Sequence, residues 1–210
     1  MQPFKLNIND YLTTETTGYY STEYTRFGRT LNPRADEISE HLRTCKNRFN
    51  DKTIDELTDA QALIPILKAA LSTIQKKENF EKPCIINVPR AKRPEMYFDA
   101  QLLFSKFVCE ASELANFPYI EALRVKNTKT THIKDERFGM VFKQKIDEQP
   151  KPYPGISRET CQIKGDIQGK NIILVDDIYT RNANIDEDFV QFLYNQGANR
   201  VILYCVGAVL

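Results

Sequence analysis

Two adjacent acids follow an apolar run near the carboxyl-terminal end of the chain. In the segment NIILVDDIY, Asp176 and Asp177 come directly after the apolar residues Ile172 to Val175. A short, continuous apolar run predicts a strand buried on both faces of a parallel sheet, so the acids should stand at the end of that strand. Carboxylates that leave water need compensating partners. The vicinal hydroxyls of a sugar can be those partners, and so can Mg²⁺ bound directly or through water.

The residues after the acids have the makeup of a phosphate-binding turn. They lead into a helix that is expected to open with a capping arrangement of Asn184 and Glu187 and to end at Gly197. Backbone N–H groups at a helix start bind phosphate, and a diol beside a phosphate indicates a ribose 5-phosphate. The plain alternative is a strand-to-helix turn, and the acids at 186–188 suit the helix dipole but would weaken phosphate binding. The candidate phosphate-binding residues are Ile178, Tyr179, Thr180, Arg181, Asn182, Ala183 and Asn184.

Alternating strands and helices are expected to position these residues. Apolar runs predict further strands over 84–88, 119–125 and 201–206, and helical spacing predicts a helix over 98–114. Strands that alternate with helices in this way indicate a parallel sheet with right-handed crossovers. Ligands of such sheets bind beyond the carboxyl ends of the strands, which is where the acids should lie.

The chain is expected to divide into a mostly helical N-terminal extension, 1–80, and an α/β domain, 81–210. Residues 1–31 show no clear period and are interpreted as a packed, irregular lead-in. Pro33 suits the first turn of a helix to about residue 49, and Pro65 should kink or divide a second helix over 53–76. The polar, mostly basic stretch 126–154 predicts a mobile hood with a short helix around 135–145.

The segment NIILVDDIYTRNAN closely resembles the PRPP-binding motif of type I phosphoribosyltransferases. That family places two acids, a hydrophobic residue, a variable residue and a Thr-Thr-Gly-Ala-Thr-like loop after an apolar strand. Upstream, NVPRAKRPEMYFDAQLLFSKFVCEASELA is similar to the Val-Pro segment, basic stretch and Phe-Asn-Gln helix of ComF-like members. The resemblance covers about residues 82–210 and implies the family's fold, a parallel sheet flanked by helices. The residues that match the motif are Asp176, Asp177, Ile178, Thr180 and Ala183.

The resemblance also implies a reaction: Mg²⁺-dependent transfer of a phosphoribosyl group from PRPP to a nucleobase or an amine. Asp176 and Asp177 would hold the ribose hydroxyls and the metal, the latter directly or through water. A second loop would receive pyrophosphate through Arg90, Ala91, Lys92 and Arg93. A hood would close over the substrate with His132, Lys134 and Arg137.

Differences from the family pattern keep other functions open. Arg181 replaces a threonine, Asn182 a glycine and Asn184 a hydroxyl residue. These changes favour the alternative of a catalytically inactive protein that binds PRPP or a nucleotide and acts as a regulator. A third possibility is a degenerate fold that serves as an interaction module.

The composition of the chain argues against several classes of binding partner. Twenty-nine Lys and Arg oppose 28 Asp and Glu, and a net charge of +1 argues against a dedicated nucleic-acid binder. No apolar run approaches the roughly 20 residues of a membrane-spanning helix, and no secretory signal opens the chain, so a soluble, cytoplasmic protein is expected. Five scattered cysteines and two histidines disfavour a structural zinc site. The acceptor, and whether the chain forms a homodimer, stay open.

Overall fold

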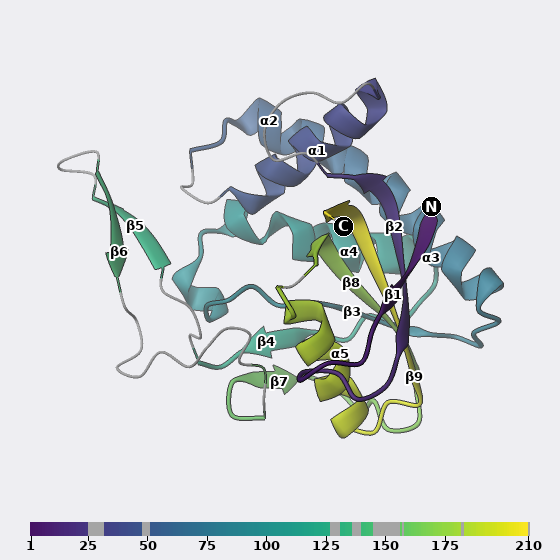
Figure 1. Cartoon of the computed structure of the whole chain (residues 1–210). Coiled ribbons are helices and arrows are strands. Elements are labelled where there is room, and N and C mark those ends of the chain that lie inside the picture. Colours follow the sequence, from purple (N-terminus) through teal and green to yellow (C-terminus); the bar gives the residue numbers. More distant parts are fainter. Residues whose placement is uncertain are drawn as a thin grey trace.

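A five-stranded sheet forms the centre of the computed structural model, with the order β1-β2-β9-β8-β3 (Figure 1). The structure describes residues 1–24, 32–47, 51–126, 131–135, 140–144, 156, 158–181 and 183–209. Neighbouring strands run parallel from β2 to β3, whereas β1 is an antiparallel edge strand. The predicted α/β class with a parallel sheet flanked by helices is therefore confirmed. The strands are β1 (Gln2–Leu6), β2 (Thr16–Glu23), β3 (Cys84–Asn87), β8 (Asn171–Thr180) and β9 (Arg200–Val209).

The first two strands lie where an irregular lead-in was predicted, and that prediction is wrong. β2 pairs with β9, so the N-terminal segment enters the central sheet itself. Tyr19 and Tyr20 are each 3% exposed and enter the apolar cores on opposite faces of the sheet. A strand buried on both faces lacks the polar alternation of a half-buried strand, so the pattern of residues 16–23 gave no period to detect.

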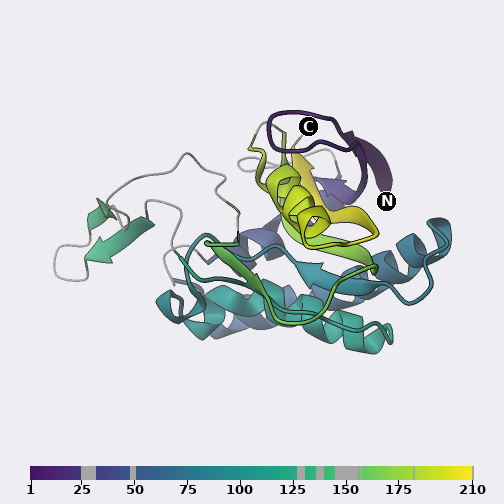
Figure 2. The same cartoon turned by 90° about the horizontal axis from the view of Figure 1, so that it is seen from below.

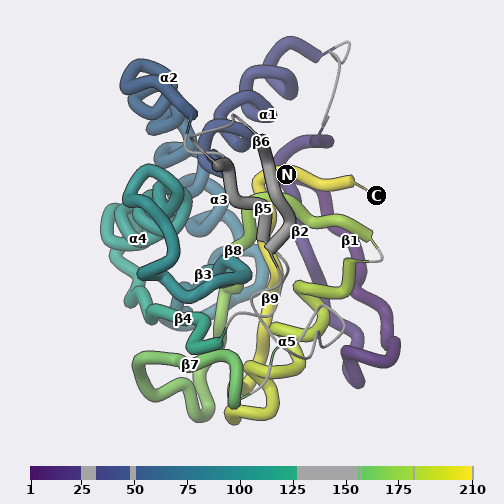
Figure 3. The backbone as a smooth tube through the Cα atoms, turned by 90° about the vertical axis from the view of Figure 1, so that its left-hand side faces the viewer, coloured from purple at the N-terminus to yellow at the C-terminus, as the bar shows by residue number. Residues whose placement is uncertain are grey.

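Helices cover both faces of the sheet (Figure 2). Helices α1 (Pro33–Lys46), α3 (Leu63–Lys77) and α4 (Leu103–Leu114) pack on one face, and α5 (Ile185–Asn195) packs on the other. Side chains of β8 alternate between these layers, with Ile173 on the α1 side and Ile172 on the α5 side. Figure 3 shows α1 lying across the carboxyl ends of β8 and β9.

Proline divides the second N-terminal helix as predicted. The helix is broken into α2 (Ile54–Asp59), a 3₁₀ turn (Ala60–Ala62) and α3. Pro65 lies in the first turn of α3, where an absent N–H removes no helical hydrogen bond. Two further 3₁₀ turns, Pro94–Met96 and Asp99–Leu102, precede α4. No described helix is long and apolar enough to span a bilayer.

Two small antiparallel pairs complete the described fold. β4 (Ala122–Arg124) pairs with β7 (Cys161–Ile163), and β5 (Thr131–Asp135) pairs with β6 (Met140–Gln144). The short helix predicted around 135–145 is wrong, because residues 140–144 form a strand whose hydrogen bonds β5 supplies. Most of the remaining predicted hood lies outside the described residues.

Candidate functional site

The chain reverses its direction across the sheet between β3 and β8. After β3 it passes through α4 to Tyr119, which pairs parallel with Ile85 on the outer side of β3. It then returns to β8 on the inner side and continues through α5 to β9. Open α/β sheets bind ligands at such a switch point, beyond the carboxyl ends of the two strands.

Asp176 and Asp177 lie at this switch point, but inside β8 and not after its end. β3 stops at Asn87, opposite Val175, whereas β8 continues beside β9 as far as Thr180. The predicted strand end at Val175 is therefore wrong, because β9 keeps supplying backbone partners past the acids. The two acids are the first residues of β8 that extend beyond β3.

The two carboxyl groups have different partners. Asp176 accepts the backbone N–H of Asp177 at 2.8 Å and forms a hydrogen bond with the carboxyl of Asp186 on α5. Asp177 instead contacts Lys46, the last residue of α1, whose Nζ lies 3.2 and 3.1 Å from its two carboxylate oxygens. The acids therefore connect the two helical layers across the end of the sheet.

Asp186 belongs to the site, although the sequence indicated only a favourable interaction with the helix dipole. The residue is 3% exposed, and its Oδ1 has no hydrogen-bond partner among the described residues. Burial and the Asp177 charge raise the pKa of Asp176 to about 7, and burial and the Asp176 charge raise the pKa of Asp186 well above its usual range. Two carboxyls in hydrogen-bond contact cannot both ionise easily, so the pair holds a proton near neutral pH.

Lys46 is a second site residue that sequence reasoning missed. Burial opposes its charge, but the Asp177 and Asp176 carboxylates outweigh burial and raise the pKa of Lys46, so the ammonium is kept. Lys46 and Asp177 lie 131 positions apart in the chain. No local spacing relates residues so distant, and only the packing of α1 on the sheet reveals their contact.

The three basic side chains of the predicted pyrophosphate loop have different partners. Arg90 donates to the carbonyls of Lys46 at 2.8 Å, Cys45 at 3.4 Å and Gln101. Lys92 Nζ lies 5.3 Å from the Tyr97 ring centroid, and burial and the Arg90 charge lower the pKa of Lys92. Arg93 pairs with Glu95 at 3.2 Å. Ala91 is partly buried between these residues.

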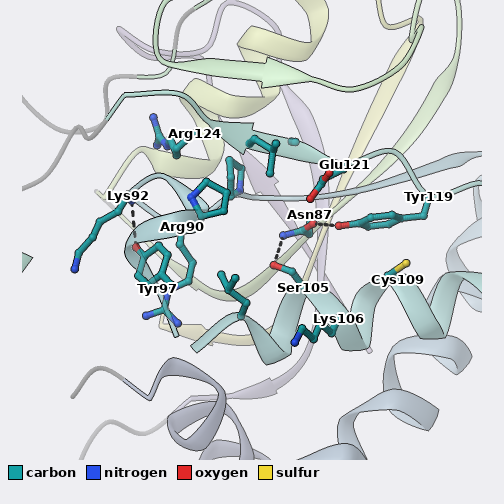
Figure 4. A pocket seen from close by; sticks show the side chains of 15 residues that line it. Asn87, Arg90, Lys92, Tyr97, Ser105, Lys106, Cys109, Tyr119, Glu121 and Arg124 are labelled. Carbon is teal, nitrogen blue, oxygen red and sulfur yellow. Dashed lines mark hydrogen bonds between the residues drawn. The ribbon is translucent and has the colours of Figure 1, made fainter. Parts of the chain in front are cut away.

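A pocket of about 250 Å³ opens beside this loop, between α4 and β4 (Figure 4). At its inner end the buried Asn87 donates to Ser105 Oγ at 2.9 Å and accepts the hydroxyl of Tyr119. Figure 4 shows the hydroxyl groups of Ser105 and Tyr119 turned toward Asn87. The sequence indicated only the loop at the rim of this pocket, because its interior combines residues from three separate segments.

The predicted phosphate turn divides into buried and exposed positions. Ile178 and Tyr179 are 8% and 4% exposed, and the Tyr179 hydroxyl donates to Glu187 at 2.9 Å. Thr180 and Arg181 are exposed at the surface. The Ala183 N–H donates to Thr180 at 3.0 Å, which closes the turn. Asn182 lies outside the described residues.

The capping arrangement predicted for α5 is only half correct. Asn184 is the N-cap residue, with φ 55°, but its side-chain oxygen accepts from Asn9 at 3.1 Å and caps no helical N–H. Glu187 accepts from Tyr179 instead of binding back to the cap. Of the predicted hood residues, His132 and Lys134 fall in β5 and Arg137 lies outside the described residues.

The donor set at the acids suits a metal ion only in part. No group of three or more His, Cys, Asp or Glu side chains in the described part of the chain is arranged to hold a metal. Both oxygens of Asp177 face an ammonium, and Asp176 is engaged by a backbone N–H and by Asp186. Mg²⁺ commonly binds through one or two carboxylates, waters and substrate phosphates. These residues therefore fit a Mg²⁺ that arrives with a phosphate ligand and contacts the acids through water.

Comparisons with known proteins found matches among solved structures. No family model matches the sequence, and a sequence search of curated proteins gave no match. Structural neighbours include a phosphoribosylpyrophosphate synthetase from Mycobacterium smegmatis (14% identity, TM-score 0.35, 68% of this chain and 33% of that one). A second neighbour is a purine phosphoribosyltransferase from Pyrococcus horikoshii (12% identity, TM-score 0.35, 70% of this chain and 82% of that one). A third is a hypoxanthine phosphoribosyltransferase from Staphylococcus aureus (11% identity, TM-score 0.34, 69% of this chain and 62% of that one).

The fold and the site define a class, an open α/β sheet with acids at its switch point. The chain spans about a third of the length of the mycobacterial enzyme. The class rests on the strand order and on the site's own geometry.

Proposed function

We propose that the chain binds a ribose 5-phosphate group at Asp176 and Asp177 and, with PRPP as donor, transfers the phosphoribosyl group to a nucleobase or amine. One observation carries this proposal: the two acids extend beyond β3 at the switch point of the sheet, beside the Lys46 ammonium. A carboxylate there can accept hydrogen bonds from adjacent hydroxyls of a sugar. The resemblance to the PRPP-binding motif supports the same ligand.

The exposed turn after β8 is the proposed site of the 5-phosphate. Thr180, the last residue of β8, and Arg181, the first residue after it, offer a hydroxyl and a guanidinium. A guanidinium forms strong charge-assisted hydrogen bonds with phosphate oxygens. This arrangement would place the sugar at the acids and the phosphate at the turn. Ile178 and Tyr179 support the turn from the core and are not proposed as phosphate contacts.

Transfer would require stabilisation of departing pyrophosphate and of positive charge at the anomeric carbon. When bound, Mg²⁺ would neutralise the pyrophosphate. The acids would hold the ribose hydroxyls so that the anomeric carbon stays oriented toward the acceptor. The basic loop at 90–93 is the proposed neighbour of the pyrophosphate.

A second function, nucleotide binding without turnover, is favoured by the partners of the charged groups. Arg90 donates to backbone carbonyls at the end of α1, and Asp186 and Glu187 are buried at the start of α5. Both features reduce the positive potential available to a pyrophosphate. A regulator that recognises the ribose and one phosphate would need less of that potential.

Calorimetry with PRPP and ribose 5-phosphate tests the shared binding step. Asp177→Asn should weaken both ligands at least 10-fold, since a hydrogen bond to a charged group contributes about 1.5–3 kcal/mol. Asp99→Asn is the matched control, because Asp99 is 94% exposed and pairs with Lys106 at 3.5 Å. Unaltered affinity in Asp177→Asn, with an unchanged melting temperature, would contradict the proposal. Pyrophosphate release with candidate acceptors then separates an enzyme from a regulator.

A further inference from the structure

The last residue of α1 reaches the acids from outside the segment that carries the PRPP-like motif. Lys46 Nζ lies within 3.2 Å of both Asp177 oxygens, and its side chain is 45% exposed. The Asp177 side chain is 19% exposed, so it is more buried than the lysine that contacts it. The contact therefore combines a partly buried carboxylate with a lysine whose side chain is partly exposed.

Several hydrogen bonds fix the end of α1 that presents Lys46. Arg90 donates to the carbonyls of Cys45 and Lys46, and Gln101 Nε2 donates to the carbonyl of Asn47 at 2.9 Å. Asn47 itself ends the helix in the left-handed conformation, with φ 31°, and its side chain accepts the N–H of Asp51 at 3.1 Å. Side-chain donors from the loop after β3 and from the turn before α4 thus hold the helix end against the core. This anchoring positions the ammonium without help from a ligand.

The position of the ammonium conflicts with a divalent cation bound directly to Asp177. A lysine ammonium is a compact point charge with three donors. It lies near both Asp177 oxygens, so a metal ion would have to displace it or accept strong repulsion at short distance. The Asp176 carboxyl is engaged by the Asp177 N–H and by Asp186. The acid pair therefore already has a cation, and it is supplied by the protein.

We propose that Lys46 is the resident cation of the acid pair, in the place that a directly bound Mg²⁺ would take. Lys46 holds the Asp177 carboxylate in one orientation, ready to accept hydrogen bonds from ribose hydroxyls. Ribose 5-phosphate, which has no pyrophosphate to chelate a metal, therefore binds without Mg²⁺. This inference rests on the proposed function and makes Lys46 a positioning residue that acts through Asp177.

Calorimetric titration of ribose 5-phosphate in Mg²⁺ and in EDTA tests the inference. The wild-type protein should bind with equal affinity in both buffers. Lys46→Met removes the charge but keeps the aliphatic stem, and should lose roughly 10-fold or more in EDTA, with part of the loss restored by Mg²⁺. Lys46→Arg keeps the charge and should retain most of the affinity. The matched control is Lys52→Met, since Lys52 lies just before α2 and pairs with Glu56 of that helix at 2.7 Å.

Titration of Mg²⁺ alone gives a readout that needs no sugar ligand. Wild-type protein should take up no Mg²⁺ at the acids, whereas Lys46→Met should gain a site that Asp177→Asn removes again. Melting curves of each variant verify that the fold is kept. Both titrations address the cation at Asp177 and not the overall stability of the chain.

Two results would overturn the inference, and each differs from a failure of the proposed function. If wild-type protein binds ribose 5-phosphate only with Mg²⁺, or if folded Lys46→Met binds as wild type does in EDTA, Lys46 is not the resident cation. If wild-type protein binds neither ribose 5-phosphate nor PRPP in either buffer, the proposed function itself is rejected, and the inference with it.

Discussion

Asp176 of β8 and Asp186 of α5 place two carboxyls in hydrogen-bond contact on the α5 side of the sheet. Asp177 and Lys46 also face Asp176, and Glu187 and Asp177 contribute to the field at Asp186. Desolvation is the largest cause of the raised pKa of each carboxyl. A group whose folded pKa exceeds its unfolded value binds more protons in the folded state. Folding stability must then fall as pH rises between the two values.

We therefore expect the chain to be more stable at mildly acidic than at mildly alkaline pH. The pKa of Asp176 moves from 3.8 unfolded to about 7 folded, so its effect on stability develops from about pH 4 and is complete above about pH 7. Each unit of pKa difference corresponds to about 1.4 kcal/mol, so the rise of about three units corresponds to a loss on the order of 4 kcal/mol. Denaturant unfolding across this pH range measures it.

Two variants distinguish the contribution of Asp176 to the pH dependence of stability from the effect of removing any acidic side chain. Asp176→Asn should flatten the pH dependence, because an amide does not titrate. Asp55→Asn, at an exposed position in the first turn of α2, should leave the slope as it is in wild type. Equal slopes in wild type and Asp176→Asn would show that the carboxyl pair does not hold the proton.

Sequence reasoning identified the two acids of β8 because both belong to one short segment with a distinct pattern. It missed Lys46 and Asp186, although they are the direct partners of those acids. Asp186 had a sufficient local explanation at the start of a helix. Lys46 is one of many basic residues on a helix surface, and only tertiary packing distinguishes it.

At the scale of elements, the loop after β3 serves as a clamp on α1. Arg90 reaches the carbonyls at the end of α1 and also lies 4.7 Å over the Tyr97 ring centroid. These carbonyls are among the groups that a helix end leaves without helical partners. Arg90 therefore joins the helix that presents Lys46 to the strand that ends beside the acids.

Arg90→Met should loosen α1 and thereby weaken ligand binding without touching the acids. We expect a loss of about 1–3 kcal/mol in unfolding free energy, because the carbonyls at the end of α1 lose a charged donor. Arg93→Met is the control: Arg93 forms an exposed pair with Glu95, and such pairs contribute about 0–1 kcal/mol. Amide exchange at residues 43–47 should accelerate in Arg90→Met alone. Equal stability of the two variants would show that Arg90 does not stabilise the end of α1.

Elements with strong local patterns were predictable, and elements defined by distant partners were not. Gly197, with φ 91°, ends α5 as predicted, and the Ala198 N–H returns to Leu193 at 3.1 Å. By contrast, β2 is a strand because β9 lies beside it, and β6 is one because β5 does. The extension of β8 past its acids has the same cause. In each case the deciding hydrogen bonds come from another part of the chain.

At the scale of the whole molecule, two apolar clusters, one on each face of the sheet, join the N-terminal and C-terminal parts. On the α1 side of the sheet, Leu42 of α1 and Leu67 of α3 belong to the same buried cluster as Ile173 of β8 and Tyr204 of β9. On the other face, Leu6 and Leu12 belong to the cluster beneath α5. Both faces of the C-terminal strands are thus covered partly by residues from the first eighty.

We therefore predict that residues 81–210 do not fold alone. Without β2, β9 would expose a long apolar edge, and without α1 and α3 only α4 would cover the Ile173 face. Burial of apolar area is the main favourable term in folding, and this fragment would lose much of it on one face. The fragment should lack a cooperative thermal transition in circular dichroism and should bind a dye specific for exposed apolar surface. Adding a separate 1–80 fragment should restore the transition, because the two parts complete each other's core. A cooperative melt of 81–210 alone would instead show that the N-terminal residues are an accessory layer, and Lys46 would then be an addition to a self-sufficient site.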